Sequence, residues 1–137
     1  EDWMWDLIWS HPEPIRRGLK GASIVSSIGG NYAGFTYPDT MTIAIADWIQ
    51  DSTFRATVSH ELGHIYHIRT GLNRTSEWQR IYREEREGRG HYGSSNDMEA
   101  FAETVKAIYA PGSYNAVPQS QIPQSVAYIK KFVDLGH

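Results

Sequence analysis

The chain has 137 residues, of which 40% are hydrophobic and 21% are charged, and its formal net charge is -3 at pH 7. This composition is typical of one globular domain and excludes the basic surface expected of a nucleic-acid-binding protein. The chain contains no cysteine, which excludes disulfides, thiol nucleophiles and cysteine-ligated zinc. We predict a single, monomeric domain over residues 1–137, without a membrane span because the longest apolar stretch is only 41–46.

An aromatic-rich N-terminal extension, residues 1–21, precedes a predicted core of residues 22–137. Residues 2–9 hold three of the five tryptophans, and their periodicity fits either a short helix or an extended segment. We interpret this segment as an aromatic flap packed on the core, with a surface for a partner or a substrate as the alternative. Two prolines within residues 11–14 end it, and residues 15–20 are expected to form a helical turn.

Three short segments, residues 22–28, 32–37 and 40–46, are predicted to be strands because turn residues separate them. Side chains alternate along the third segment, so Met41, Ile43 and Ile45 are expected to face the core. The segments predict an α+β fold with a small twisted sheet of mostly antiparallel strands, packed on a helix.

Four helices are predicted after the strands. Their expected ranges are about 53–69, 77–87, from near Asn96 to just before Pro111, and from Pro118 or Pro123 to Leu135. The first is expected to begin at an N-cap cluster of residues 51–53 and to end before Gly71. No repeat, low-complexity tract or internal domain boundary is visible in the sequence.

The first of these helices carries the segment His60-Glu61-Leu62-Gly63-His64, an HExxH motif. Its spacing puts two imidazoles one turn apart on the same helix face, with a carboxylate between them. Such a pair can bind zinc through two nitrogens and aim a general base at the metal-bound water. We therefore predict one catalytic zinc ion, His60 and His64 as ligands, and Glu61 as the base.

A catalytic zinc needs a third protein ligand. The metzincin continuation is excluded because His67 and Thr70 stand where it requires glycine and histidine, and the aspzincin pattern is also absent. The lack of cysteine excludes the deformylase type. A carboxylate from a later helix remains, and Glu99 and Glu103 are both candidates because they lie one turn apart.

Spacing alone does not choose between the two glutamates. Glu99 also fits a capping box with Asn96, and Glu103 also fits a charge on a helix surface. If Glu99 binds the metal, Glu103 can accept a hydrogen bond from the free ring nitrogen of a ligating histidine.

A resemblance to a known family rests on the HExxH segment and on Tyr92, which stands seven residues before Glu99 in the stretch that runs on to Glu103. This pattern resembles the peptidase domain of the anthrax lethal factor family, which includes the secreted Pro-Pro endopeptidases. The family has a loop tyrosine seven residues before the ligand glutamate, in a segment similar to YxxxxxxEFFAE.

The resemblance implies a zincin-like peptidase of the gluzincin type, in which a C-terminal helix supplies the third zinc ligand. It makes His60, His64 and Glu99 the ligands and Glu61 the base. It also makes Tyr92 the residue that stabilises the transition state, and favours Glu103 as the partner of a ligating histidine. The match covers roughly residues 22–135 and is specific only at the two motif segments.

Three positions depart from the family pattern. Ala100 replaces the first of two aromatic residues, and the loop directly before the 40–46 strand has no tryptophan, so proline specificity does not follow. His67 stands where relatives often carry an acid. It is expected to be either a pH-sensitive group beside a ligand or a partly exposed helix residue.

The expected function is zinc-dependent endoproteolysis of an extended protein or peptide substrate. The alternatives are a catalytically inactive zinc-binding interaction module of a larger toxin or secreted protein, and a binding domain in which HExxH is fortuitous. The chain begins at Glu1 without an initiator methionine or a basic-then-apolar leader. We interpret it as a processed product or an excised domain, and expect it to be secreted or part of a larger exported protein.

Gluzincins bind the substrate along an edge strand, and the 40–46 segment is the best candidate because it directly precedes the HExxH helix. This interpretation makes Thr42, Ile43 and Ala44 substrate-binding residues. An ordinary core strand is an equally good reading of the same pattern.

Overall fold

The computed structural model describes residues 2–90 and 95–137. These residues form α-helices and one small sheet, which confirms the predicted α+β class. The elements are α1 (Asp2–Trp9), α2 (Glu13–Arg16), β1 (Gly21–Val25), β2 (Gly34–Tyr37), β3 (Thr42–Ala46), α3 (Asp51–Thr70), α4 (Ser76–Glu85), α6 (Asp97–Tyr109) and α7 (Pro123–Asp134). Short 3-10 turns cover residues 72–74, 86–89 and 119–121.

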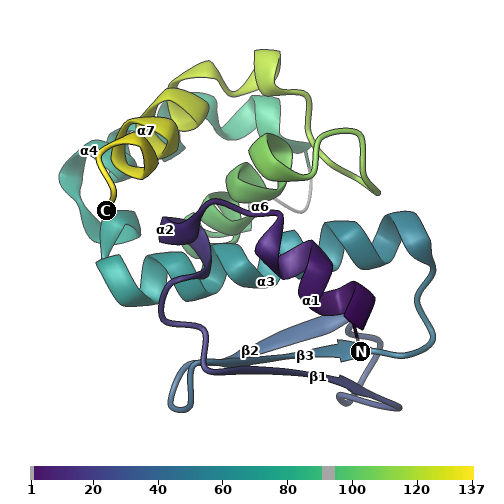
Figure 1. The fold of residues 1–137 in the computed structure, drawn as a ribbon. Coiled ribbons are helices and arrows are strands. Elements are labelled where there is room, and N and C mark those ends of the chain that lie inside the picture. Colours follow the sequence, from purple (N-terminus) through teal and green to yellow (C-terminus); the bar gives the residue numbers. More distant parts are fainter. Residues whose placement is uncertain (1, 91–94) are drawn as a thin grey trace.

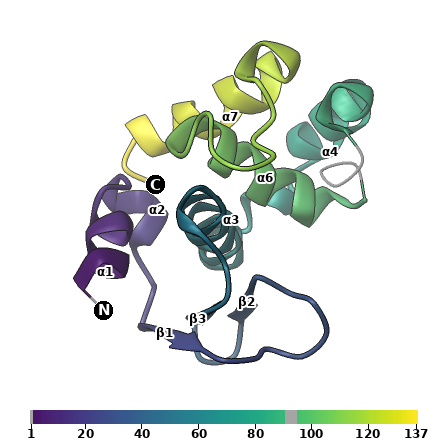
Figure 2. The same ribbon diagram turned by 90° about the vertical axis from the view of Figure 1, so that its right-hand side faces the viewer.

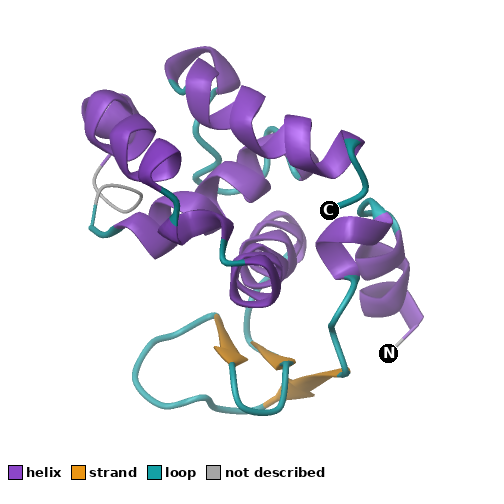
Figure 3. Ribbon diagram, turned by 90° about the vertical axis from the view of Figure 1, so that its left-hand side faces the viewer, coloured by secondary structure: helices purple, strands orange, loops and turns teal. Residues whose placement is uncertain are grey.

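Helix α3 is central to the arrangement (Figures 1 and 2). The sheet lies on one side of it, and α6 lies on the opposite side with α4 and α7 beyond (Figure 3). The N-terminal helices α1 and α2 pack against a third flank of α3. Buried apolar side chains such as Leu62, Ile65 and Tyr66 leave α3 in several directions, and this explains why the helix has no clear polar face.

The sheet has the strand order β1-β3-β2, in which β1 is parallel and β2 antiparallel to β3. The sheet is therefore mixed, and the prediction of mostly antiparallel strands is wrong. Ile43 and Ile45 are buried in the core as predicted, and their apolar strand takes the central position of the sheet.

The prediction that residues 40–46 form an edge strand is also wrong. Backbone groups of β3 already pair with β1 on one side and with β2 on the other. Thr42, Ile43 and Ala44 therefore cannot add a substrate strand, since an extended peptide needs an unpaired edge. The two edges of the sheet are β1 and β2, and the order of the three strands along the chain did not reveal this arrangement.

The ends of α3 explain its length. Gln50, in extended conformation, is the N-cap, and the predicted cap cluster lies inside the first turn, where Asp51 interacts favourably with the helix dipole. Gly71 ends the helix in the left-handed conformation with φ 71°, and its N–H donates to the carbonyl of His67 over 2.8 Å. This C-terminus is the one predicted from the glycine.

The crossing of α3 and α6 is unusually close at Gly63. A Cβ atom at this position would lie 2.7 Å from Cα of Ala102, so only glycine fits without movement of a backbone. Helix α6 begins where the side chain of Asn96 accepts a hydrogen bond from the backbone N–H of Glu99 over 2.8 Å. Together the cap and the crossing fix which turns of α6 face the HExxH motif.

The N-terminal segment is a helix rather than an extended piece. Met4 and Ile8 are buried and attach it to the core, whereas Trp3, Trp5 and Trp9 are 49%, 39% and 64% exposed. The predicted flap therefore packs through its aliphatic side chains, and not mainly through its tryptophans. Among the residues described, no helix combines the length and apolar character needed to cross a membrane.

Candidate metal centre

Three side chains that were predicted as zinc ligands come together where α3 and α6 face each other. His60 Nε2 lies 2.9 Å from Glu99 Oε2, and His64 Nε2 lies 3.2 Å from Glu99 Oε1. One atom from each side chain lies within 4.8 Å of the others. Since neighbouring ligands of a tetrahedral zinc ion are separated by about 3.3 Å, this donor set has the right size for one ion.

The hydrogen bonding of Glu99 also fits a metal. Its Oε2 atom is buried and lies 2.9 Å from His60 Nε2. A buried carboxylate needs a compensating positive charge, which a protonated His60 or a bound metal ion would supply. Two nitrogens and a carboxylate are the donor set of catalytic zinc sites that keep a fourth position open.

Glu103 holds the second nitrogen of His60. The Nδ1 atom of His60 lies 2.6 Å from Glu103 Oε2, and this hydrogen bond leaves Nε2 to face Glu99. Lys106 in turn lies 2.9 Å from Glu103 Oε1, so the carboxylate bridges a histidine and a buried ammonium. A carboxylate on the outer nitrogen of a ligating histidine fixes the ring and its tautomer.

His67 contacts the Nδ1 atom of His64, as Glu103 contacts the Nδ1 atom of His60. Its Nε2 atom lies 2.8 Å from His64 Nδ1, and its ring packs edge-on against Phe101. His67 is only 5% exposed, so the alternative of a partly exposed helix residue is wrong. Burial and the neighbouring His64 lower the pKa of His67 to about 3, which keeps its ring neutral. Its Nε2 atom can therefore accept a hydrogen bond from the N–H of His64 Nδ1.

In the absence of a metal, electrostatics favour a protonated His60. Burial acts to lower its pKa, but the hydrogen bonds to Glu103 and Glu99 outweigh burial and raise the pKa to about 10. The same contacts hold the pKa values of Glu99 and Glu103 below their usual range, although burial opposes this shift. Both carboxylates are therefore ionised at neutral pH, and a metal would replace a proton on His60.

Glu61, the predicted base, is held at the side of α3 that faces β2. Its Oε1 accepts a hydrogen bond from Thr36 Oγ1 over 2.8 Å, and the Thr36 hydroxyl also lies 3.2 Å from the Glu61 carbonyl. The approach of β2 depends on Gly34, where a Cβ atom would lie 2.5 Å from Thr57 Cγ2 and 3.1 Å from Glu61 Oε2. Thr36 and Gly34 thus position the base, and the sequence alone gave no signal for either role.

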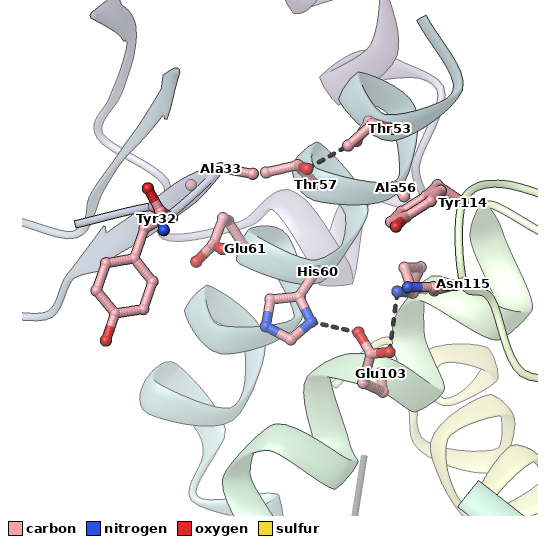
Figure 4. A pocket seen from close by; sticks show the side chains of 13 residues that line it. Tyr32, Ala33, Thr53, Ala56, Thr57, His60, Glu61, Glu103, Tyr114 and Asn115 are labelled. Atoms are coloured by element: carbon pink, nitrogen blue, oxygen red, sulfur yellow. Dashed lines mark hydrogen bonds and ion pairs between the residues drawn. The ribbon is translucent and has the colours of Figure 1, made fainter. Parts of the chain in front are cut away.

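A cavity of about 250 Å³ opens beside this centre (Figure 4). His60, Glu61 and Glu103 line it together with residues of the loops before β2 and after α6. The other lining residues are Asn31, Tyr32, Ala33, Gly34, Thr53, Ala56, Thr57, Lys106, Tyr114 and Asn115. The cavity adjoins the candidate ligand His60 and the candidate base Glu61, so a bound molecule would contact both.

Sequence reasoning missed several residues of this cavity. Lys106 was available as a signal, because it follows Glu103 by three positions and therefore shares its helix face. Tyr114 and Asn115 come from a loop whose path depends on the packing of α6, and no local pattern marks them. Tyr92, the predicted transition-state residue, lies outside the described residues, so its role stays a prediction.

Comparisons of the chain with known protein families, with curated proteins and with solved structures found no match. The interpretation of the site therefore depends on its own geometry.

Proposed function

We propose that this protein is a zinc-dependent endopeptidase. The observation that carries the proposal is the convergence of His60 Nε2, His64 Nε2 and the Glu99 carboxylate beside a cavity lined by Glu61. His60 and His64 each have a further partner on the outer ring nitrogen, as ligating histidines usually do. The resemblance of the HExxH and Tyr92–Glu103 segments to the lethal factor family supports the same proposal. Because that family includes secreted enzymes, we also propose that the protein is exported.

We propose a role for each of these residues. Zinc, when bound by His60, His64 and Glu99, would act as a Lewis acid toward water and the peptide carbonyl. Glu61 is placed to accept a proton from the attacking water and to deliver it to the leaving amine, while Thr36 holds one of its oxygens. Tyr92 is proposed to stabilise the oxyanion that develops on the carbonyl oxygen.

We propose β2, rather than β3, as the strand that binds the substrate. It is an edge of the sheet, so one side of its backbone has no strand partner in the described structure. It also lies directly beside the base, as the short distance between Gly34 and Glu61 shows. An extended peptide paired with β2 would thereby pass next to the Glu61 carboxylate and the metal ligands.

The test combines metal analysis with cleavage of a proteome-derived peptide library. Wild type should hold one zinc ion per chain and cleave within peptides, and Glu61→Gln should keep the zinc and lose cleavage. Glu99→Ala should lose the zinc itself. Tyr92→Phe should keep the zinc and lower kcat by about 10²–10³, the usual cost of removing one donor to an oxyanion.

Two results would contradict the proposal in different ways. A protein prepared without chelators that contains no zinc would remove the metal assignment. Stoichiometric zinc without cleavage of any library peptide would remove the peptidase assignment and favour a zinc-binding interaction module.

A further inference from the structure

The cavity beside the metal centre contains a cation that the proposed chemistry does not use. Among the described residues that line it, Lys106 is the one lysine or arginine, and it is only 6% exposed. It lies on α6, one turn beyond Glu103, and its stem shares the buried face of that helix. A buried ammonium needs hydrogen-bond acceptors because bulk water cannot solvate it.

The protein supplies Lys106 with fewer acceptors than it can use. An ammonium group has three N–H donors, and the described residues offer one acceptor, Glu103 Oε1 at 2.9 Å. The other oxygen of Glu103 is engaged by His60 Nδ1 at 2.6 Å, so this carboxylate is shared between the imidazole and the ammonium. Donors of Lys106 therefore remain for a molecule in the cavity.

The surroundings of Lys106 suit a small acidic group. Besides Glu103 and His60, the described lining residues at this side are neutral, and they include Thr53, Tyr114 and Asn115, which can add hydrogen bonds. Glu61, the other acid of the cavity, lies toward β2, whereas Glu103 and Asn115 lie on the other side of His60 (Figure 4). A carboxylate near Lys106 would thus be separated from Glu61 by the histidine.

The size of the cavity limits what can enter. A volume of about 250 Å³ corresponds to roughly eight water molecules at about 30 Å³ each, which is room for one side chain. The lining at the β2 side includes the small residues Ala33 and Gly34. One substrate side chain next to the scissile bond fits this space, with its tip at the ammonium.

We propose that Lys106 is a specificity-determining residue that selects a substrate with an acidic side chain, aspartate or glutamate, next to the scissile bond. This inference rests on the proposed peptidase function and identifies its substrate class. A charge-assisted hydrogen bond in a water-poor site is stronger than a neutral one, so a glutamate is favoured over the isosteric glutamine.

The experiment uses short peptide hydroxamates that carry glutamate, glutamine or leucine next to the hydroxamate group. The hydroxamate anchors on the zinc of the loaded full-length protein, and the adjacent side chain samples the cavity. Wild type should bind the glutamate probe roughly tenfold more tightly than the glutamine probe, a difference of about 1.4 kcal/mol. Lys106→Met should abolish this ratio, and Lys106→Arg should retain most of it.

The ratio separates specificity from damage to the metal site, because both probes use the same anchor. Lys130→Met, at an exposed position of α7, is the matched control and should leave the ratio unchanged. Equal binding of the two probes by wild type, or an unchanged ratio in Lys106→Met, would overturn the inference. A clear glutamate preference in a protein that cleaves no peptide would sink the peptidase proposal and leave the assignment of Lys106 intact.

Discussion

Glu103 Oε2 lies 2.6 Å from His60 Nδ1, the shortest of the contacts between α6 and the HExxH histidines. Through this contact helix α6 orients a candidate ligand that belongs to helix α3. Because the bond fixes a proton on Nδ1, Nε2 is the nitrogen that faces Glu99 and that is left to bind a metal. Glu103 also forms an ion pair with Lys106 through its other oxygen, so one carboxylate contacts both groups.

Glu103 variants should weaken metal binding without removing a ligand. Removal of such an outer partner typically lowers metal affinity by about 10–100-fold, and we expect this loss for Glu103→Ala. Glu103→Gln, which keeps an oxygen acceptor but not the charge, should have an intermediate effect. Competition for zinc with a fluorescent chelator measures both values. Affinities equal to wild type in both variants would show that the His60–Glu103 contact does not influence the metal.

His67 should act in the same way on the second ligand. Its neutral ring accepts a hydrogen bond from His64 Nδ1 over 2.8 Å when His64 offers Nε2 to a metal. We expect His67→Phe to lower zinc affinity, by less than Glu103→Ala because a neutral acceptor is weaker than a carboxylate. His67→Gln, which can still accept, is the control and should lie closer to wild type. The same chelator competition measures these zinc affinities. A larger loss of affinity for His67→Gln than for His67→Phe would show that His67 does not act as a hydrogen-bond acceptor for His64.

Much of this site could be predicted from local sequence patterns. The helix with HExxH and the helix with Glu99 and Glu103 were found within a few residues, because caps and apolar periodicity are local properties. The choice between the two glutamates required the structure. Only the register between α3 and α6, set at Gly63 and Ala102, shows that Glu99 faces both Nε2 atoms and Glu103 faces Nδ1.

The errors concern relationships between distant segments. β3 was predicted to be an edge, yet it is central, because strand order depends on the path of the β1–β2 connection. His67 was open to two interpretations because a histidine on a helix gives no sign of which neighbouring helix covers it. Thr36 and Lys106 were missed for the same reason, since each acquires its role by contact with another part of the site.

Zinc binding should release a proton near neutral pH. Without metal, His60 has a pKa raised to about 10, so it is protonated in this range, and its Nε2 must lose the proton to bind zinc. Glu99 contributes no proton, because its pKa is held below the usual range. The apparent affinity should therefore rise with pH, by up to about tenfold per unit, until the pH reaches the His60 pKa.

Calorimetric titration with zinc in two buffers of different ionisation enthalpy counts the released protons. Glu103→Gln is the informative control, since loss of the carboxylate lets burial lower the His60 pKa and should reduce the number of protons released near neutral pH. A buffer-independent enthalpy for wild type would show that His60 is neutral before the metal binds.

Gly63→Ala tests the helix crossing on which the site depends. In a helix interior, alanine is normally more favourable than glycine by about 1 kcal/mol. Here the added Cβ would lie 2.7 Å from Ala102 Cα and 3.1 Å from Val105 Cβ, so α6 must move away from α3. We expect a net destabilisation of about 1–3 kcal/mol in urea unfolding, together with weaker zinc binding because Glu99 moves with α6.

Gly21→Ala, whose Cβ would meet only Thr42 Cγ2 at 3.4 Å, is the control and should change stability by less than about 0.5 kcal/mol. A Gly63→Ala protein that is more stable than wild type and binds zinc normally would show that the crossing has room for a side chain.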